Sequence, residues 1–111
     1  MRKVLFIISS DPRMSHRPAE AIRIAAGTGA WARAQVNICL TGQAILILNA
    51  DEDALKDAEQ FSMCLPMLCE SQRPIYVLKE TTSPVSKPPV REINLEELSR
   101  LALEHDVVAR F

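Results

Sequence analysis

The sequence predicts a single α/β domain whose strands form a parallel, doubly wound sheet, and three observations support this prediction. Residues 3–9 and 36–41 are nearly continuous apolar runs, which parallel strands show when helices cover both faces of the sheet. Helical patterns alternate with the apolar runs, as right-handed crossovers between parallel strands require. The length of 111 residues fits one domain, so we expect one unit over 1–111.

The first helix is expected over 19–32, after a polar loop at 11–18 that contains two prolines. Ser15 is a suitable N-cap, and Pro18 fits the first turn of the helix. Small residues on one side of this segment let the helix lie close to the sheet. Gly27 lowers helix stability by about 1 kcal/mol relative to alanine, so the helix can end early or bend there.

A short helical segment follows the second strand, and a longer helix is expected over 51–70. Asn49 and Glu52 have the spacing of a capping box, in which a side chain accepts the first free backbone N–H groups of the helix. Pro66 removes one backbone hydrogen bond, so this helix is expected to kink or to split in two.

The third strand is expected at 75–78, because this short segment is apolar and rich in β-forming residues. Three prolines make 81–91 an irregular loop. A second cap pattern at 94–97 begins the last helix, and 106–111 forms the closing strand. We therefore expect a mainly parallel sheet of four to five strands.

Composition and charge exclude several classes of protein. Apolar residues make up 48% of the chain, charged residues 24%, and the formal net charge is −1. No global field therefore attracts the chain to nucleic acid or to an anionic membrane. No apolar run approaches the roughly 20 residues that cross a bilayer, and 4–8 is too short for a signal sequence. Three cysteines, an odd number, suit a reducing compartment, so we expect a cytoplasmic protein.

Polar residues follow the first three predicted strands. In open parallel sheets, ligands bind outside the carboxyl ends of the strands, and these ends meet at one edge. We therefore expect a ligand-binding edge made of three groups of residues, which are Ser9, Ser10, Asp11, Arg13 and His16, then Thr41, Gly42 and Gln43, and finally Lys79.

We expect 9–16 to be a surface loop, and anion binding is the alternative that has a chemical basis. Loop hydroxyls, Arg13, Arg17 and the positive end of the following helix dipole all attract phosphate-like groups. A Ser-His-Asp triad is disfavoured, because triads are assembled by the fold and rarely come from neighbours in sequence. The acidic residues at 51–53 fit helix caps, so we expect no metal site, and no motif indicates a cofactor.

The opening strand at 3–9, the helix rich in small residues and the stretch NICLTGQAILIL at 37–48 resemble the DsrE/DsrF-like family, which includes the Tus sulfur-relay subunits. The resemblance continues through the helix at 51–70, the strand at 75–79 and the helix-strand pair at 94–111. It implies a three-layer α/β/α sandwich with a flavodoxin-like, DsrE-like sheet. It also implies assembly as dimers, trimers or hexamers.

The chain departs from this family at one position that matters for chemistry. The family's active members carry a persulfide on a cysteine at the end of the strand that follows the long helix. The matching segment here, 74–80, contains no cysteine, and Leu78 or Lys79 stands where the thiol is expected.

The three cysteines present do not clearly replace the missing thiol. A sulfur carrier needs a partly exposed thiolate with a lowered pKa. Cys39 lies in a predicted buried strand, where cysteine usually acts as a small apolar residue. Cys64 and Cys69 lie about 140° apart around a helix, and their spacing fits neither a zinc site nor a redox pair. Cys39 and Cys69 remain the candidates if a cysteine does carry sulfur.

Two functions of different class therefore remain open, and nucleotide binding at the loop 9–16 is a third possibility. The first is a DsrE-like accessory protein that catalyses no reaction and binds a partner protein or small ligand at the strand edge. The second is a persulfide carrier that uses another cysteine in intracellular sulfur transfer. In either case we expect a homo-oligomer, from dimer to hexamer, because a small domain with 48% apolar residues gains by burying more surface. A sulfur-relay protein is the partner that the resemblance suggests.

Overall fold

The computed structural model describes residues 2–31, 34–49, 52–69, 75–78 and 90–111. In chain order the elements are β1 (Lys3–Ile8), α1 (Arg17–Trp31), β2 (Gln35–Leu40), η1 (Gly42–Ile45), α2 (Leu46–Asn49), η2 (Glu52–Ala54), α3 (Ala58–Cys69), β3 (Ile75–Leu78), β4 (Val90–Ile93), α4 (Leu95–Leu103) and β5 (Val107–Arg110).

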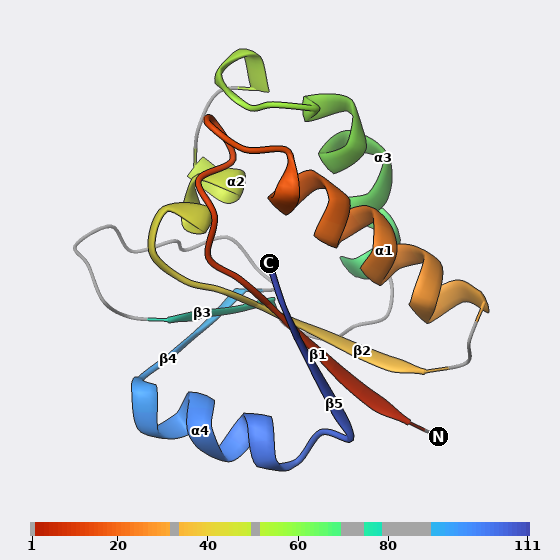
Figure 1. Ribbon diagram of the computed structural model, residues 1–111, viewed down its shortest axis with the longest axis vertical. Helices are drawn as coiled ribbons and strands as arrows, with labels where there is room; N and C mark the ends of the chain where they lie inside the picture. Colours follow the sequence, from red (N-terminus) through yellow and green to blue (C-terminus); the bar gives the residue numbers. More distant parts are fainter. Residues whose placement is uncertain (1, 32–33, 50–51, 70–74, 79–89) are drawn as a thin grey trace.

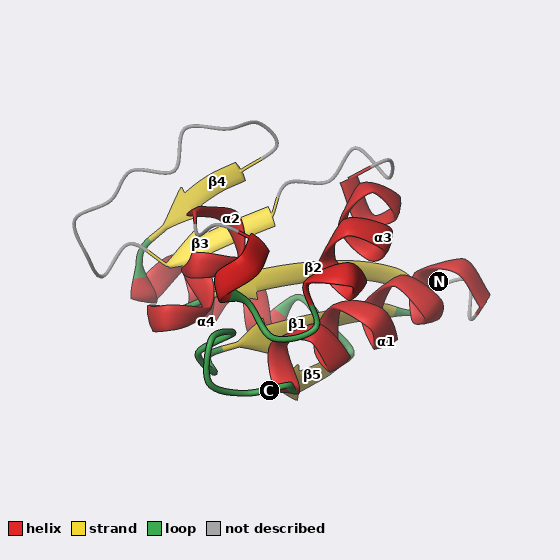
Figure 2. Ribbon diagram, turned by 90° about the horizontal axis from the view of Figure 1, so that it is seen from above, coloured by secondary structure: helices red, strands yellow, loops and turns green. Residues whose placement is uncertain are grey.

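The described strands form one sheet in the order β4-β3-β2-β1-β5, and all neighbouring pairs are parallel. Helices α1, α2 and α3 lie on one face of this sheet, and α4 lies on the other (Figures 1 and 2). The predicted three-layer α/β/α sandwich with a parallel sheet is therefore confirmed. The carboxyl ends of β1 and β2, which run side by side in register, meet at one edge.

The face under α1 and α3 is closed by apolar side chains from both layers. Phe6 and Ile8 of β1, Ile38 and Leu40 of β2, and Ile22 of α1 are all buried there. The predicted close approach of a helix with small residues is also observed, because alanines of α1 belong to the same buried cluster. Most of the buried apolar residues in the described part of the chain belong to this cluster.

The face under α4 has a smaller buried cluster, made of Leu5, Ile7, Cys39 and Ile93. No residue of α4 itself is buried, although Leu98, Leu101 and Ala102 pack partly against the cluster. The predicted cap of this helix is confirmed. The Asn94 side chain accepts the Glu97 N–H at 2.8 Å, and the Glu97 carboxylate accepts the Asn94 N–H at 3.3 Å.

Two predicted segments differ from the structure. The loop expected over 81–91 gives way to β4 at Val90, so this strand was missed. The helix expected over 51–70 is broken into η2 and α3. Asn49, which was expected to cap that helix, is the last residue of α2. Asp57, just before α3, has a φ of +58°, a left-handed conformation that a continuous right-handed helix excludes.

The local expectations for α1 and α3 are partly confirmed. Helix α1 begins at Arg17 and runs on through Gly27 without ending there. Ser15 lies two residues before the helix, and its hydroxyl accepts the Arg17 backbone N–H at 3.1 Å. Pro66 lies inside α3, which is one helix on both sides of it, so the expected split is wrong.

Candidate functional site

The structure brings two of the predicted groups together at the carboxyl edge of the sheet. The Thr41 backbone N–H donates to the Ile8 carbonyl at 2.9 Å, and the Thr41 hydroxyl donates to the Ser9 hydroxyl at 2.9 Å. On the other side, the N–H groups of Ser9 and Ser10 donate to the Phe111 carbonyl at 2.9 and 3.3 Å. The ends of β1, β2 and β5 are thus joined in one polar row.

Asp11 and Arg13 form a closed pair within the loop after β1. The Asp11 carboxylate accepts the Arg13 backbone N–H at 2.9 Å and two guanidinium N–H groups at 3.1 and 2.8 Å. The guanidinium hydrogen bonds, and next the backbone one, hold the pKa of Asp11 below its usual range. Arg13 is therefore already neutralised and is a weaker anion ligand than its sequence position indicates.

His16 pairs with Asp57, which the sequence did not single out as a site residue. The His16 Nδ1 atom and the Asp57 carboxylate form a hydrogen-bonded pair across 41 positions of sequence. Beside it, the Lys56 backbone N–H donates to the Pro12 carbonyl at 2.7 Å. The only hint in the sequence is weak: aspartate is among the few residues that adopt the left-handed backbone seen here.

These pairs decide against the catalytic arrangement considered for the loop. His16 pairs with Asp57, and the Ser9 hydroxyl receives its hydrogen bond from Thr41, so the described contacts do not link serine, histidine and Asp11 in a relay. Arg17 lies over the Phe111 ring, 5.9 Å from its centroid. The second cation predicted to bind anions is therefore also engaged within the fold.

The remaining predicted residues of the edge are exposed or outside the described part of the chain. Gly42 has a φ of +53°, which turns the chain from β2 into η1, and Gln43 follows it on the surface. Lys79 lies outside the described residues. Among those described, no three His, Cys, Asp or Glu side chains could hold a metal ion together.

The cysteines lie in the interior where the structure describes them. Cys39 has no exposed surface in the middle of the sheet, and burial raises the pKa of its thiol to about 12. Cys64 is buried in α3. The side chain of Cys69, at the end of the same helix, lies outside the described part. Leu78, at the end of β3, is an apolar residue only 4% exposed.

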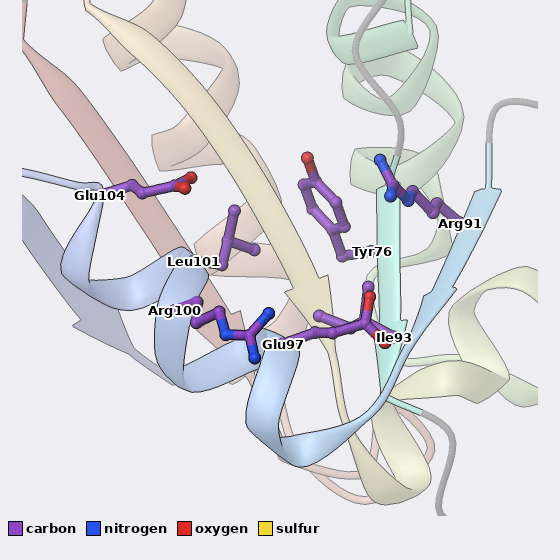
Figure 3. A pocket seen from close by; sticks show the side chains of 7 residues that line it. All are labelled: Tyr76, Arg91, Ile93, Glu97, Arg100, Leu101 and Glu104. Atoms are coloured by element: carbon purple, nitrogen blue, oxygen red, sulfur yellow. The ribbon is translucent and has the colours of Figure 1, made fainter.

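A groove that the sequence did not indicate lies on the face of the sheet that α4 covers, between α4 and the β3–β4 edge (Figure 3). Its cavity volume is about 250 Å³. Tyr76 and Arg91, neighbours across β3 and β4, stand on its sheet side. The groove depends on β4, which the sequence left as a loop.

Across the described segments, none of the helices has both the length and the apolar character that spanning a bilayer requires.

The structure is similar to a solved structure, that of the ychN protein from E. coli. The TM-score is 0.79, the two sequences are 19% identical, and the alignment covers 100% of each chain. No protein-family model and no curated protein matches this chain. The likeness supports the DsrE-like fold that the sequence resemblance implies, and at this identity it shows the fold alone.

Proposed function

We propose that this chain is a cytoplasmic, homo-oligomeric accessory protein with a DsrE-like fold, which binds a partner protein or small ligand and carries no persulfide. The observation that carries the proposal is the end of β3. Leu78 or Lys79 stands where the family that the sequence resembles has its sulfur-carrying cysteine, and Leu78 is a core residue only 4% exposed. Neither a leucine nor a lysine side chain can carry a persulfide.

The state of Cys39 supports the same proposal. Sulfur transfer begins with attack by a thiolate, which must be both deprotonated and accessible. Cys39 has no exposed surface, and a pKa raised to about 12 keeps it protonated at neutral pH. Of the two candidates named from the sequence, this leaves Cys69 as the residue on which the alternative function depends.

The carboxyl edge is the surface that we assign to partner or ligand binding. Ser9, Arg13, His16, Gly42 and Gln43 are all exposed there. Internal pairs hold two of these side chains in place, namely Arg13 by Asp11 and His16 by Asp57. A polar surface whose side chains are already ordered loses less entropy on association, which favours recognition of a partner protein.

A persulfidation assay tests the proposal. The protein is incubated with a cysteine desulfurase and free cysteine, which gives up its sulfur atom and becomes alanine. A carrier thiol then becomes a persulfide, and intact mass spectrometry without reductant detects a gain of about 32 Da. Lys79→Cys, which places a thiol directly after β3, is the positive control, and Cys69→Ser is the matched removal.

We expect no added mass on the unmodified protein and a single sulfur on the Lys79→Cys variant. An adduct on the unmodified protein that disappears in Cys69→Ser would establish the persulfide carrier instead. Self-association is tested separately by light scattering at micromolar protein, where a strict monomer would contradict the oligomeric part of the proposal.

A further inference from the structure

The groove between α4 and the β3–β4 edge has an apolar floor and a charged rim. Tyr76, Ile93 and Leu101 form the floor, with Tyr76 and Leu101 facing each other across it (Figure 3). The volume of about 250 Å³ lies just below the 300 to 1,000 Å³ that is typical of ligand pockets. The groove therefore suits a small ligand with an apolar body.

The rim carries two guanidinium groups and two carboxylates, but these groups are not equally available. Arg100 pairs with Glu96 at 2.8 Å, one turn away on α4. The Glu97 carboxylate accepts the Asn94 N–H in the helix cap. These two rim groups already have partners.

Arg91 and Glu104 differ from the other two rim groups. Within the described part of the chain, neither side chain forms an ion pair or hydrogen bond. They stand on opposite sides of Tyr76, with Arg91 on β4 and Glu104 at the end of α4 (Figure 3). The groove thus has one available cation, one available anion and an aromatic ring between them.

We propose that this groove binds a short peptide with free ends, whose carboxylate is held by Arg91 and whose ammonium group is held by Glu104. The apolar body of the peptide packs on Tyr76, Ile93 and Leu101. This is a separate site from the carboxyl edge, and it does not depend on the function proposed above.

The spacing of the charges favours a peptide over a single amino acid. Arg91 is one strand beyond Tyr76, a step of about 4.8 Å, and α4 lies on the other side of the ring. The two ends of the ligand must therefore be several ångströms apart. An extended dipeptide spans roughly 7 Å, whereas the two charges of a free amino acid share one carbon atom.

The balance of charge on the rim favours a zwitterion over a simple ion. Two basic and two acidic side chains line the groove, so its net charge is zero. An anion attracted to Arg91 faces Glu97 and Glu104, and a cation attracted to Glu104 faces Arg91 and Arg100. Only a ligand with both charges places each of them opposite its complement.

The experiment uses alanyl-phenylalanine and two analogues, each of which lacks one charge. The acetylated dipeptide has no ammonium group, and the dipeptide amide has no carboxylate. Each compound is titrated into isotope-labelled protein, and binding is followed by the shifts of backbone amide signals. We expect the free dipeptide to shift the signals of Tyr76, Arg91 and Leu101, and to bind about tenfold more tightly than either analogue.

Two variants assign the charges. Arg91→Gln should weaken the free dipeptide by about tenfold and abolish its advantage over the amide, while its advantage over the acetylated form persists. Glu104→Gln should also weaken the free dipeptide by about tenfold. It should abolish the advantage over the acetylated form, while the advantage over the amide persists. Arg23→Gln, an exposed arginine on α1 at the other face, is the matched control and should bind like the unmodified protein.

The proposal is overturned by any of three results. The first is the absence of shifts in the groove at millimolar dipeptide. The second is equal binding of the dipeptide and both analogues, which would mean that the two charges of the ligand do not contribute to binding. The third is a set of shifts confined to another part of the surface. Spectra of the free variants establish that each is folded, so a loss of binding is not a loss of structure.

Discussion

The two faces of the sheet differ in how completely helices cover them. Under α1 and α3, residues of both layers are sealed from solvent, as shown by Ile22 at 0% and Leu40 at 1% exposure. Under α4, the strands bury Cys39 as fully, yet the helix contributes no buried residue and Leu103 remains 86% exposed. One face therefore contains most of the buried apolar side chains, whereas on the other face the described helix covers the sheet less completely.

This difference explains where polar groups lie. At the carboxyl edge beside the closed face, polar side chains pair with one another, as His16 does with Asp57. On the open face, α4 with its nine residues is the helix that the described part of the chain provides, and Arg91 and Glu104 line a groove between it and the β3–β4 side. Most of the buried apolar side chains therefore lie on one side of the sheet and the groove lies on the other, while the carboxyl edge is a separate surface.

The largest expected effect on stability comes from matched leucine-to-alanine substitutions on the two faces. Leu40→Ala removes a sealed side chain and should lower the free energy of unfolding by about 2–5 kcal/mol. Leu98→Ala, on partly exposed α4, should lower it by about 1 kcal/mol, because the Leu98 side chain buries less apolar surface in the folded protein than Leu40 does. Urea denaturation measures both. Equal losses would contradict the view that the faces contribute unequally.

A hydrogen-bonded bridge gives the open face part of its stability. His105 Nδ1 lies 2.6 Å from the Leu101 carbonyl, which can only accept, so this nitrogen donates. His105 Nε2, 2.7 Å from Asn37 Nδ2, then accepts from the amide. Asn37→Ala should therefore lower the free energy of unfolding by about 1 kcal/mol.

A double-mutant cycle with His105→Ala isolates this bridge from other effects of the substitutions. The coupling between the two positions should be about 1 kcal/mol in urea denaturation. Additive losses would mean that the Asn37–His105 contact does not attach α4 to the sheet.

A backbone constraint at Asp57 makes the carboxyl edge of the closed face sensitive to substitution. The φ of +58° disfavours any residue with a Cβ atom other than a few polar ones. Asp57→Ala and Asp57→Gly both remove the pair with His16, so their difference reports the backbone alone. The glycine variant should be more stable by about 1 kcal/mol in urea denaturation, and an equally stable alanine variant would contradict a left-handed residue there.

The sequence predicts elements with strong local patterns better than elements without them, and the reason is physical. Continuous apolar runs and helix caps come from local residues, so β1, β2 and the α4 cap could be identified. Strand β4 was missed because only Ile93 of its four residues is buried, which leaves no strong pattern. The groove, which needs β4, was missed with it.

The edge shows the same limit at the level of side chains. Parallel topology correctly placed Ser9 beside Thr41, because strand ends must meet. It could not choose partners. Asp11 pairs with Arg13, two residues away, and His16 pairs with Asp57, 41 residues away. Which of these partners each side chain contacts depends on the conformation of the folded loops.

The smallest expected effect is the pH dependence of the Asp11–Arg13 pair. Hydrogen bonds from the Arg13 side chain, and next from its backbone N–H, lower the pKa of Asp11 in the folded protein. The unfolded chain therefore binds this proton at higher pH than the folded one does. The pair stabilises the fold above the unfolded pKa of about 3.9, and this contribution is lost as pH falls through the folded pKa.

Asp11→Asn removes the titrating group and keeps the shape of the side chain. Its unfolding midpoint in urea should be slightly below that of the unmodified protein at pH 7. The two midpoints should begin to converge at about pH 4 and should meet once the pH is below the lowered folded pKa of Asp11. The difference is small because solvent screens an exposed pair. A gap that persists unchanged into acid would mean that Asp11 acts through its neutral hydrogen bonds, and the edge would then owe its order to loop geometry instead of charge.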